Sequence, residues 1–424
     1  MGERKRYVVA GTGSRGLHMY AKPLLKNFPE YSELVGLFDH NLPRLEAATE
    51  LLGAKLPLYT DFQTMLRQAR PDGVIVTTRD STHAEYIIQT LDAGARAISE
   101  KPLCVDGRQC RAILAAAKKA RRKGARCFVT HNMRYGPEET EIKRLVDTGA
   151  LGQVKAINFH ENLDRRHGAD YFRRWHRIKK NSGGLLIHKA SHHFDFLNWV
   201  AGATPDLLTA QGGLLFYGKN GPFRHPRCEG CPHAAKCDFH VDLWSQKNTR
   251  RLYKDAEQAD GYIRDACVFD RKIDIEDQAA VLYTYRNGIR VTYSLTAFAT
   301  YEGMHIQIEG AAGRLELKTI HNTSFAMGNA VVQGMEQLTG QQFTLYRPKE
   351  GVRNVEVPKL EGSHGGSDPQ LQFDFFGRPF DAPPTARMAP VEEAVQAVLI
   401  GHAANVSIAK DSRPVRVQEF LKRG

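Results

Sequence analysis

The sequence contains no apolar run long enough to cross a bilayer. Its first residues, Met1 to Arg6, are polar and lead directly into a strand-like stretch, whereas a secretory signal requires an apolar segment at that place. We therefore expect a cytoplasmic protein that makes no membrane contact. Only seven of the 424 residues are cysteine, and because disulfides are rare in the cytoplasm, we do not expect disulfide bonds.

Nucleic-acid-binding motifs are also absent, although the chain is basic. Lys and Arg total 59 against 47 Asp and Glu, which gives a net charge of +12. The positive residues are scattered or occur in helix-like stretches such as Lys118–Lys123, a pattern typical of a solvent-exposed helix face. We expect no nucleic-acid partner, and an acidic sugar substrate would be another use for the positive charge.

A glycine-rich turn marks the beginning of the chain. The buried-strand pattern of residues 7–10 runs into Gly11-Thr12-Gly13-Ser14-Arg15-Gly16, which fits G-x-G-x-x-G, and a helix-like segment follows. In this motif Gly11 permits a tight turn, Gly13 lets the backbone approach a pyrophosphate, and Gly16 lets the helix pack on the strand. The succession of strand, turn and helix predicts a dinucleotide-binding site rather than a glycine-rich turn without a ligand.

An acidic residue completes this cofactor signature. Asp39 ends the next predicted strand, residues 34–38. Its carboxylate is expected to bind the adenosine ribose hydroxyls and to repel a 2′-phosphate, which favours NAD over NADP. Arg44 lies close by in the sequence and weakens this preference.

Strand and helix patterns alternate through residues 1–130. This alternation predicts an α/β fold, a Rossmann-type doubly wound parallel sheet with helices on both faces. Ligands bind at the carboxyl ends of the strands in such sheets. Thr77, Thr78 and Glu100-Lys101-Pro102 fall at strand ends and are therefore candidates for the cofactor site.

Further motifs extend well beyond the turn. They are Thr82-His83, Glu100-Lys101-Pro102, and Gly183-Gly184 followed by His192 and Asp195. Together with the glycine-rich turn, these motifs resemble the glucose–fructose oxidoreductase and inositol dehydrogenase family (Gfo/Idh/MocA) over nearly the whole chain. The Glu-Lys-Pro run is the most specific of them.

The resemblance implies both a fold and an active site. Lys101 would be the catalytic lysine, and Pro102 would follow a cis peptide bond. The second domain, residues 131–424, would be of α+β class, with a large open, mainly antiparallel sheet that carries the substrate or a partner subunit in a homodimer or homotetramer. Motifs and resemblance together predict the cofactor-binding residues Gly11, Gly13, Ser14, Arg15, Gly16, Asp39, Thr77, Thr78, His83, Glu100 and Lys101.

The segment after the double glycine departs from the family pattern G-G-x-x-x-D-x-G-x-H-x-x-D. His188 stands where the first aspartate is usual and Ala190 replaces the following glycine, whereas His192 and Asp195 match. On one helix, His188, His192 and Asp195 would share a face. Several ionisable groups on one face predict a site, although two histidines four residues apart could instead bind a metal ion. We predict Lys101, His192 and His188 as the catalytic residues.

Two further segments are predicted to contact the substrate. Residues 171–177 are aromatic and basic, which suits the C–H faces and hydroxyls of a sugar but is also typical of an amphipathic surface helix. Residues 132–135 resemble the family's N-x-R-Y/F segment beside the nicotinamide. The predicted substrate-binding residues are Asn132, Arg134, Tyr135, Trp175, His176, Arg177, Lys189 and His193.

A cysteine cluster lies in an insertion at about residues 220–270. Cys228, Cys231 and Cys237 form C-x2-C-x5-C, and Cys267 could supply a fourth thiolate. Four sulfurs suit tetrahedral zinc or an iron–sulfur cluster, and a metal would stabilise a stretch with few apolar residues. Structural zinc, reduced thiols in a loop and an iron–sulfur cluster remain open.

The rest of the second domain shows the patterns of an antiparallel sheet. Residues 340–379, rich in Gly, Pro and charge, are expected to form a mobile loop, and residues 391–408 a helix that packs back between the domains. Asn287-Gly288 predicts a hairpin turn. Alternating apolar and polar residues predict strands at 279–285, 290–297 and 305–309.

These features predict an NAD(H)-dependent oxidoreductase that moves hydride between the nicotinamide and a ring carbinol of a sugar, sugar derivative or polyol. A second hypothesis is an NAD-dependent glycoside hydrolase. In that reaction a transient C3 ketone acidifies the C2 proton, the glycosidic group is eliminated, water adds and the hydride returns. A third hypothesis is a non-catalytic regulator that binds NAD and a sugar. Relatives of that kind usually lose the catalytic lysine or histidine, and both positions are filled here.

Overall fold

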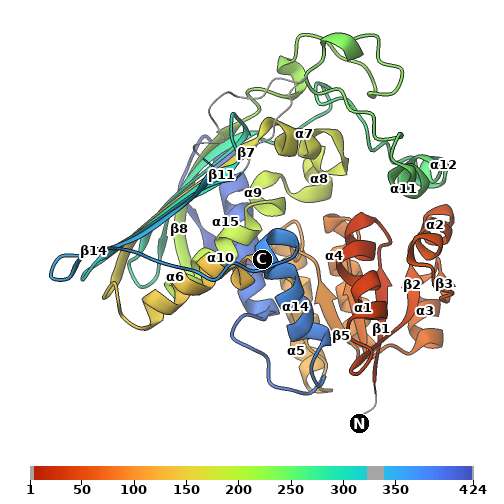
Figure 1. Cartoon of the computed structure of the whole chain (residues 1–424), viewed down its shortest axis with the longest axis horizontal. Helices are drawn as coiled ribbons and strands as arrows, with labels where there is room; N and C mark the ends of the chain where they lie inside the picture. The colour runs from red at the N-terminus through yellow and green to blue at the C-terminus, as the bar shows by residue number, and fades with distance from the viewer. Residues whose placement is uncertain (1–3, 322–338, 423–424) are drawn as a thin grey trace.

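The computed structural model describes residues 4–321 and 339–422. Two sheets organise these residues, one in the N-terminal domain and a larger one in the second domain (Figure 1). None of the helices in the described ranges is long and apolar enough to span a membrane. All seven cysteines are free thiols.

The first sheet has the order β15-β6-β5-β4-β1-β2-β3 and is parallel except for β15. It confirms the predicted doubly wound sheet, with one addition: β15 comes from the C-terminal part of the chain and pairs antiparallel with β6. The strands are β1 (Lys5–Ala10), β2 (Ser32–Phe38), β3 (Leu58–Tyr59), β4 (Gly73–Val76), β5 (Arg96–Ser99), β6 (Cys127–Val129) and β15 (Ala389–Pro390).

Helices follow the strands of this sheet as the alternating pattern predicts. Val8, Val9 and Ala10 of β1 are fully buried, because helices cover the sheet on both faces. A turn of π-helix, η1 (Gly16–Ala21), precedes the first α-helix. The helices of this domain are α1 (Lys22–Lys26), α2 (Leu42–Leu52), α3 (Phe62–Ala69), α4 (Asp80–Asp92) and α5 (Gly107–Arg121).

The second sheet has the order β14-β13-β12-β11-β7-β10-β9-β8-β16, and only β7 and β10 pair in parallel. The large, mainly antiparallel sheet and the hairpin between β9 and β10 are therefore confirmed. The strands are β7 (Val154–Asp164), β8 (Pro205–Gly213), β9 (Gln278–Tyr285), β10 (Arg290–Ala299), β11 (Gly303–Gly310), β12 (Arg314–Ile320), β13 (Gly340–Arg347), β14 (Gly351–Asn354) and β16 (Val415–Arg416).

Helices connect this sheet to the first domain. The longest, α15 (Val391–Ala409), contacts β8 and α10 of the second domain and also α5 and β6 of the first. Most of its residues are fully buried, which explains its nearly uniform apolar sequence. The others are η2 (Asn132–Tyr135), α6 (Pro137–Asp147), α7 (Arg165–Arg173), η3 (Trp175–Arg177), α8 (Lys179–Ser182), α9 (Leu185–His188), α10 (Ser191–Ala201) and η8 (Val417–Leu421).

The mobile loop expected over residues 340–379 is a wrong prediction. Strands β13 and β14 begin this stretch, and η7 (Ser363–Gly366) and α14 (Ser367–Phe376) end it. Helix α14 packs on the first domain, where the rings of Phe376 and Tyr7 meet edge to face at a centroid distance of 5.2 Å. Five of the ten Gly and Pro residues in this stretch lie inside these elements, so composition alone misjudged the segment.

The insertion consists of short turns rather than long elements: η4 (Gly218–Asn220), η5 (Ala234–Lys236), α11 (Lys247–Thr249), η6 (Arg250–Lys254) and α12 (Glu257–Asp260). It leaves the second domain after β8 and extends to α2 of the first domain, as the green segment in Figure 1 shows.

A buried ion pair ties η2, the first helix after the N-terminal domain, to two other helices of the second domain. Arg134 in η2 donates two hydrogen bonds of 2.7 Å to Asp195 in α10, and its Nη2 lies 2.7 Å from Glu393 in α15. The side chains of Arg134 and Asp195 are 1% and 0% exposed. Removing one partner of such a pair leaves an uncompensated buried charge.

We expect Arg134→Met to lower the free energy of unfolding by about 3–5 kcal/mol, because Asp195 would lose its counter-ion in the interior. Urea unfolding followed by circular dichroism measures the change. Arg144→Met is the matched control, since Arg144 pairs with Glu141 on the surface of α6 and is expected to leave stability nearly unchanged. Equal effects of the two substitutions would contradict the role given to Arg134.

Candidate active site

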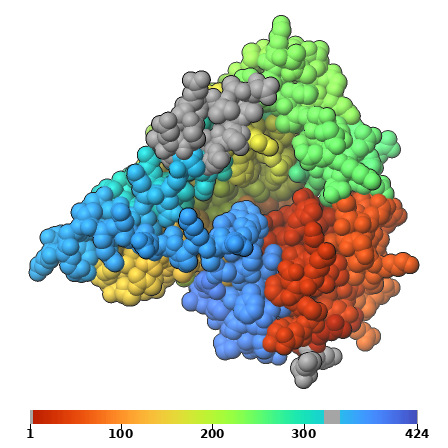
Figure 2. Space-filling model, in the orientation of Figure 1, coloured from red at the N-terminus to blue at the C-terminus, as the bar shows by residue number. Residues whose placement is uncertain are grey.

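A cleft of about 2370 Å³ lies at the carboxyl ends of the first-domain strands. Its walls come from the glycine-rich turn, the second domain, the insertion and residues 354–360. Figure 2 shows this face of the molecule hollowed where these parts meet. The volume exceeds that of a typical small-ligand pocket, and a dinucleotide together with a sugar fits within such a space.

The glycine-rich turn leaves no room for side chains at its ends. Gly11 has a φ of +101°, and a Cβ atom there would lie 2.7 Å from the backbone of Thr77. A Cβ atom on Gly16 would lie 2.1 Å from the carbonyl oxygen of Gly11. The turn therefore packs tightly against the end of β4, and its residues fit the pyrophosphate of a dinucleotide.

Asp39 is fixed at the end of β2 by the same turn. Its Oδ2 accepts hydrogen bonds from the backbone N–H and the hydroxyl of Thr12, at 2.9 and 3.1 Å. Arg44 does not point freely into the cleft: it is buried, lies 3.4 Å from Asp39 and donates a 2.6 Å hydrogen bond to Asp260. With two carboxylates engaging Arg44, the adenosine end of the cleft is poorly suited to a 2′-phosphate.

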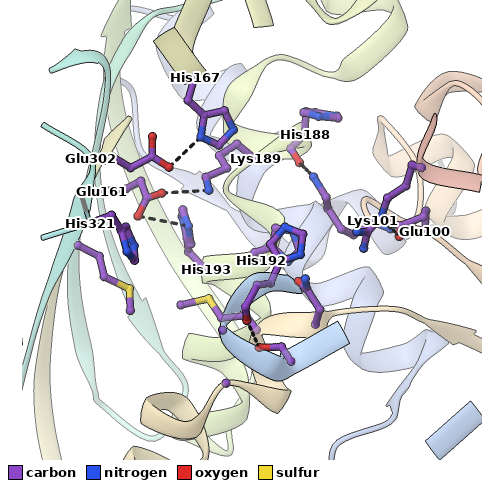
Figure 3. A pocket seen from close by; sticks show the side chains of 18 of the residues that line it. Glu100, Lys101, Glu161, His167, His188, Lys189, His192, His193, Glu302 and His321 are labelled. Carbon is purple, nitrogen blue, oxygen red and sulfur yellow. Dashed lines mark hydrogen bonds and ion pairs between the residues drawn. The ribbon is translucent and has the colours of Figure 1, made fainter. Parts of the chain in front are cut away.

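Lys101 lies at the end of β5 next to Pro102, and the peptide bond between them is cis, as the resemblance implied. Its Nζ donates a 3.0 Å hydrogen bond to the carbonyl oxygen of His188 (Figure 3). Burial lowers the pKa of Lys101 to about 8, although Asp80 and Glu100 act in the opposite direction. Near neutral pH this amine can therefore both release and accept a proton.

Two hydrogen bonds hold the carboxylate of Glu100, the residue before Lys101. Its Oε1 accepts hydrogen bonds from Arg15 Nε at 2.7 Å and from the hydroxyl of Tyr20 at 2.6 Å. Arg15 also lies 3.4 Å from Asp368 in α14. Arg15 lines the cleft as predicted, but these two carboxylates already engage its guanidinium.

His83, in α4, contacts the Glu-Lys-Pro turn. Its ring nitrogens are 2.8 Å from the carbonyl oxygen of Pro102 and 3.1 Å from that of Thr78. The side chain thus joins the start of α4 to the Glu-Lys-Pro turn.

The structure overturns the prediction that His188, His192 and Asp195 share one helix face. Helix α9 ends at His188 and α10 begins at Ser191, so the chain turns between the two histidines. His188 faces the first domain, His192 lines the centre of the cleft, and Asp195 binds Arg134 in the interior. Asp195 is therefore a structural residue.

Asp80 is a site residue that the sequence reasoning missed. It begins α4, and its Oδ2 lies 2.5 Å from Nδ1 of His188. Burial raises the pKa of Asp80 and lowers that of His188, so both shifts favour a pair without net charge. The ring of His176 lies next to that of His188 at a centroid distance of 4.1 Å. No local motif marks Asp80, because its partner is 108 positions away in the chain.

His192 is a neutral imidazole in this setting. Burial and the nearby charge of Lys101 lower its pKa well below the ordinary value. Its Nδ1 is buried and has no hydrogen-bond partner within the described residues. The residue lines the cleft, where a neutral imidazole can exchange a proton with a ligand hydroxyl.

A second group of ionisable side chains lies on the sheet side of the cleft (Figure 3). Glu161 in β7 lies 3.0 Å from Lys189 Nζ and 3.6 Å from His193 Nε2. Next to it, His167 Nδ1 is 2.8 Å from Glu302. Burial raises the pKa of Glu161, which favours its protonated form more than at the surface. Of this group, only Lys189 and His193 were predicted.

The predicted substrate-binding residues divide into two sets. Arg134 is in the ion pair with Asp195, Tyr135 packs against the guanidinium of Arg387, and Arg177 pairs with Asp270. These three do not line the cleft. The residues that do line it are Asn132, Trp175, His176, Lys189 and His193.

The cysteine cluster is not supported as a metal site. No group of three or more His, Cys, Asp or Glu side chains in residues 4–321 and 339–422 is arranged to hold a metal ion. Structural zinc at Cys228, Cys231, Cys237 and Cys267 is therefore corrected to free thiols. Ion pairs of Arg227 with Asp265 and Glu257 and the packing of Phe239 on Phe269 hold the insertion together instead.

Fold and cleft together define a two-domain oxidoreductase with a dinucleotide-binding first domain. The family profile "Oxidoreductase family, NAD-binding Rossmann fold" matches residues 5–131, and "Oxidoreductase family, C-terminal alpha/beta domain" matches residues 143–417. The chain belongs to this Gfo/Idh/MocA family.

Relatives with known sequences or structures agree with this membership. The putative oxidoreductase YteT of Bacillus subtilis is 31% identical over 439 residues, covering 99% of each chain. The scyllo-inositol 2-dehydrogenase (NAD(+)) of the same organism is 29% identical over 53% of this chain and 60% of its own. An oxidoreductase domain protein from Kribbella flavida superposes with a TM-score of 0.69 at 19% identity, covering 98% of this chain and all of its own. Levoglucosan dehydrogenase in complex with NADH and levoglucosan has a TM-score of 0.67 at 17% identity, over 98% and 100% of the two chains.

Asp39→Ser is expected to reduce the preference for NAD over NADP by roughly tenfold, since hydrogen bonds to charged groups contribute about 1.5–3 kcal/mol. Titration of each cofactor by protein fluorescence gives the ratio of dissociation constants. Asp92→Ser serves as the control, because Asp92 pairs with Lys119 on the surface of the same domain. An unchanged ratio in Asp39→Ser would show that another group selects the cofactor.

Proposed function

We propose that the protein oxidises and reduces a ring carbinol of a sugar, sugar derivative or polyol with NAD(H). The observation that carries this proposal is the position of Lys101, a buried amine with a pKa of about 8, in the same cleft as the glycine-rich turn and His192. When bound, NAD supplies the hydride acceptor. The chain's own residues must then place the substrate and move one proton.

Lys101 and His192 are the proposed proton acceptors. The hydrogen bond from Lys101 Nζ to the carbonyl oxygen of His188 fixes the amine toward the cleft, and the neutral amine can take the proton of the substrate hydroxyl. The charge of Lys101 is one cause of the lowered pKa of His192, and both residues line the same cleft, so we assign that proton to these two groups. In the reverse direction the protonated lysine donates it.

His188 is proposed to assist from the side of the first domain. Its bond to Asp80 fixes the orientation of the ring. Trp175 lies edge-on to the same ring at 5.7 Å and offers an aromatic face to the C–H surface of a sugar. The aspartate usual in the family is thus replaced by a histidine and aspartate pair.

The cluster of Glu161, Lys189 and His193 favours glycoside hydrolysis as a second candidate function. Elimination after transient oxidation needs a further acid or base near the ring, and this cluster lines the same cleft as Lys101. In simple oxidation and reduction these groups would bind hydroxyls instead.

One incubation separates these functions. The protein is mixed with NAD and a panel of sugars and aryl glycosides while NADH absorbance and aglycone release are recorded. Net NADH formation supports the proposed oxidoreductase. Aglycone release without net NADH supports the hydrolase, and NAD binding with neither product supports a regulator and contradicts both enzymatic proposals.

Lys101→Met is expected to lower kcat at least 100-fold, since general acid–base catalysis contributes about 10²–10⁴. Lys101→Arg should lose about as much, because its charge remains but arginine does not give up its proton. NAD binding, measured by fluorescence, should survive in both variants, and Lys119→Met on the exposed face of α5 is the control. Full activity of Lys101→Arg would exclude Lys101 as the base.

The pH dependence of sugar oxidation follows from the same lysine. The neutral amine is the active form, so kcat/KM should rise with pH below a pKa of about 8 and level off above it. Initial rates of NADH formation across this range measure the profile. A profile that is flat through neutral pH would contradict the assignment.

A further inference from the structure

The insertion is fastened to the first domain at the adenosine end of the cleft. Arg44 Nη2 donates to Asp260 at 2.6 Å, and its Nε donates to the carbonyl oxygen of Leu252 at 3.2 Å. Asn41 Nδ2 donates to the carbonyl oxygen of Ala256 at 2.9 Å. These hydrogen bonds are buried or partly buried, so the insertion and the first domain form a packed interface here.

Tyr253 carries this contact to the glycine-rich turn itself. Its hydroxyl accepts a 2.8 Å hydrogen bond from the backbone N–H of Ser14. The same hydroxyl lies 3.3 Å from where a Cβ atom of Gly13 would be. Backbone N–H groups at this point of the motif are the ones that hold a cofactor pyrophosphate. The insertion therefore reaches the pyrophosphate position.

Arg264 lies beside this position and lacks a fixed counter-ion. Its guanidinium is stacked over the ring of Tyr253 at 3.9 Å and lines the cleft. Among the described residues, no carboxylate is within ion-pair distance of Arg264. Asp170, the carboxylate that most affects its pKa, already pairs with Arg173 and Arg174.

Tyr262 adds a buried hydroxyl beside this cation. The hydroxyl interacts with Arg264, and the residue also lines the cleft. Its ring meets that of Tyr253 edge-on at 6.1 Å. A cation that lacks a carboxylate partner on the wall of the cleft points to an anionic ligand.

We propose that the insertion clamps the dinucleotide in the cleft, with Arg264 binding the pyrophosphate, the hydroxyl of Tyr253 completing its contacts and Tyr262 supporting Arg264. The guanidinium would neutralise the phosphate charge from the side opposite the glycine-rich turn. The cofactor would then be held between two domains and would leave slowly. This inference depends on dinucleotide binding and not on which sugar reaction follows.

The pyrophosphate is a better partner for Arg264 than a substrate carboxylate. Arg264 stacks on Tyr253, whose hydroxyl is bound to Ser14 of the glycine-rich turn. The charge of Arg264 is also one cause of the lowered pKa of His176, a predicted substrate-binding residue, so an acidic substrate is the competing partner for this cation.

The test compares two ligands that differ in the pyrophosphate. Arg264→Gln should weaken ADP-ribose and NAD binding by roughly tenfold or more and speed NAD dissociation by a similar factor, because a charged hydrogen bond is lost. Adenosine, which has no phosphate, should bind equally well to both proteins. Calorimetry measures the affinities for ADP-ribose and NAD. Stopped-flow fluorescence measures the rate of NAD dissociation, and ligand-observed NMR measures the binding of adenosine.

Arg271→Gln is the matched control, because Arg271 is an exposed arginine of the same part of the chain and lies outside the cleft. Tyr253→Phe should show a smaller loss of ADP-ribose affinity than Arg264→Gln. Equal weakening of adenosine and ADP-ribose would mean that Arg264 only supports the fold of the insertion, and unchanged ADP-ribose affinity would assign Arg264 to the substrate. Either result overturns the clamp, while a failure to oxidise sugars would not affect it.

Discussion

The hydrogen bond from Lys101 Nζ to the carbonyl oxygen of His188 joins the two halves of the active site. Lys101 belongs to the end of a first-domain strand, whereas His188 ends a helix that begins after the double glycine of the second domain. The bond can form only if both domains are in place. The lowered pKa of the lysine depends on the same closure, because burial between the domains is its main cause.

The parts of this site that follow from local sequence were predictable. The glycine-rich turn, Asp39 and the Glu-Lys-Pro run each depend on backbone conformation within a few residues, and all three line the cleft. The strand patterns likewise predicted both sheets. The spacing argument was wrong at His188, because one helix ends there and the next, α10, begins at Ser191. A periodicity that assumes one continuous helix therefore put His188 on the same face as His192 and Asp195.

Partners that are distant in the chain could not be predicted. Asp80 meets His188, and Glu161 meets Lys189, only after the two domains assemble. Arg134 has the polar character of a binding residue, yet tertiary contacts place it in the interior opposite Asp195. The cysteine spacing resembled a metal site, but spacing along a chain does not fix whether sulfur atoms converge on one point.

Strand β15 has a consequence for how the chain must be made. It completes the edge of the first sheet by pairing with β6, although about 260 residues separate the two strands. During synthesis from the N-terminus, the edge of β6 stays uncovered until nearly the whole chain has emerged, and open strand edges invite pairing with other chains. A fragment that ends at residue 130 would carry the complete glycine-rich turn and still lack the strand that closes its sheet. Isolated preparation of the cofactor domain would therefore require a segment from the opposite end of the chain.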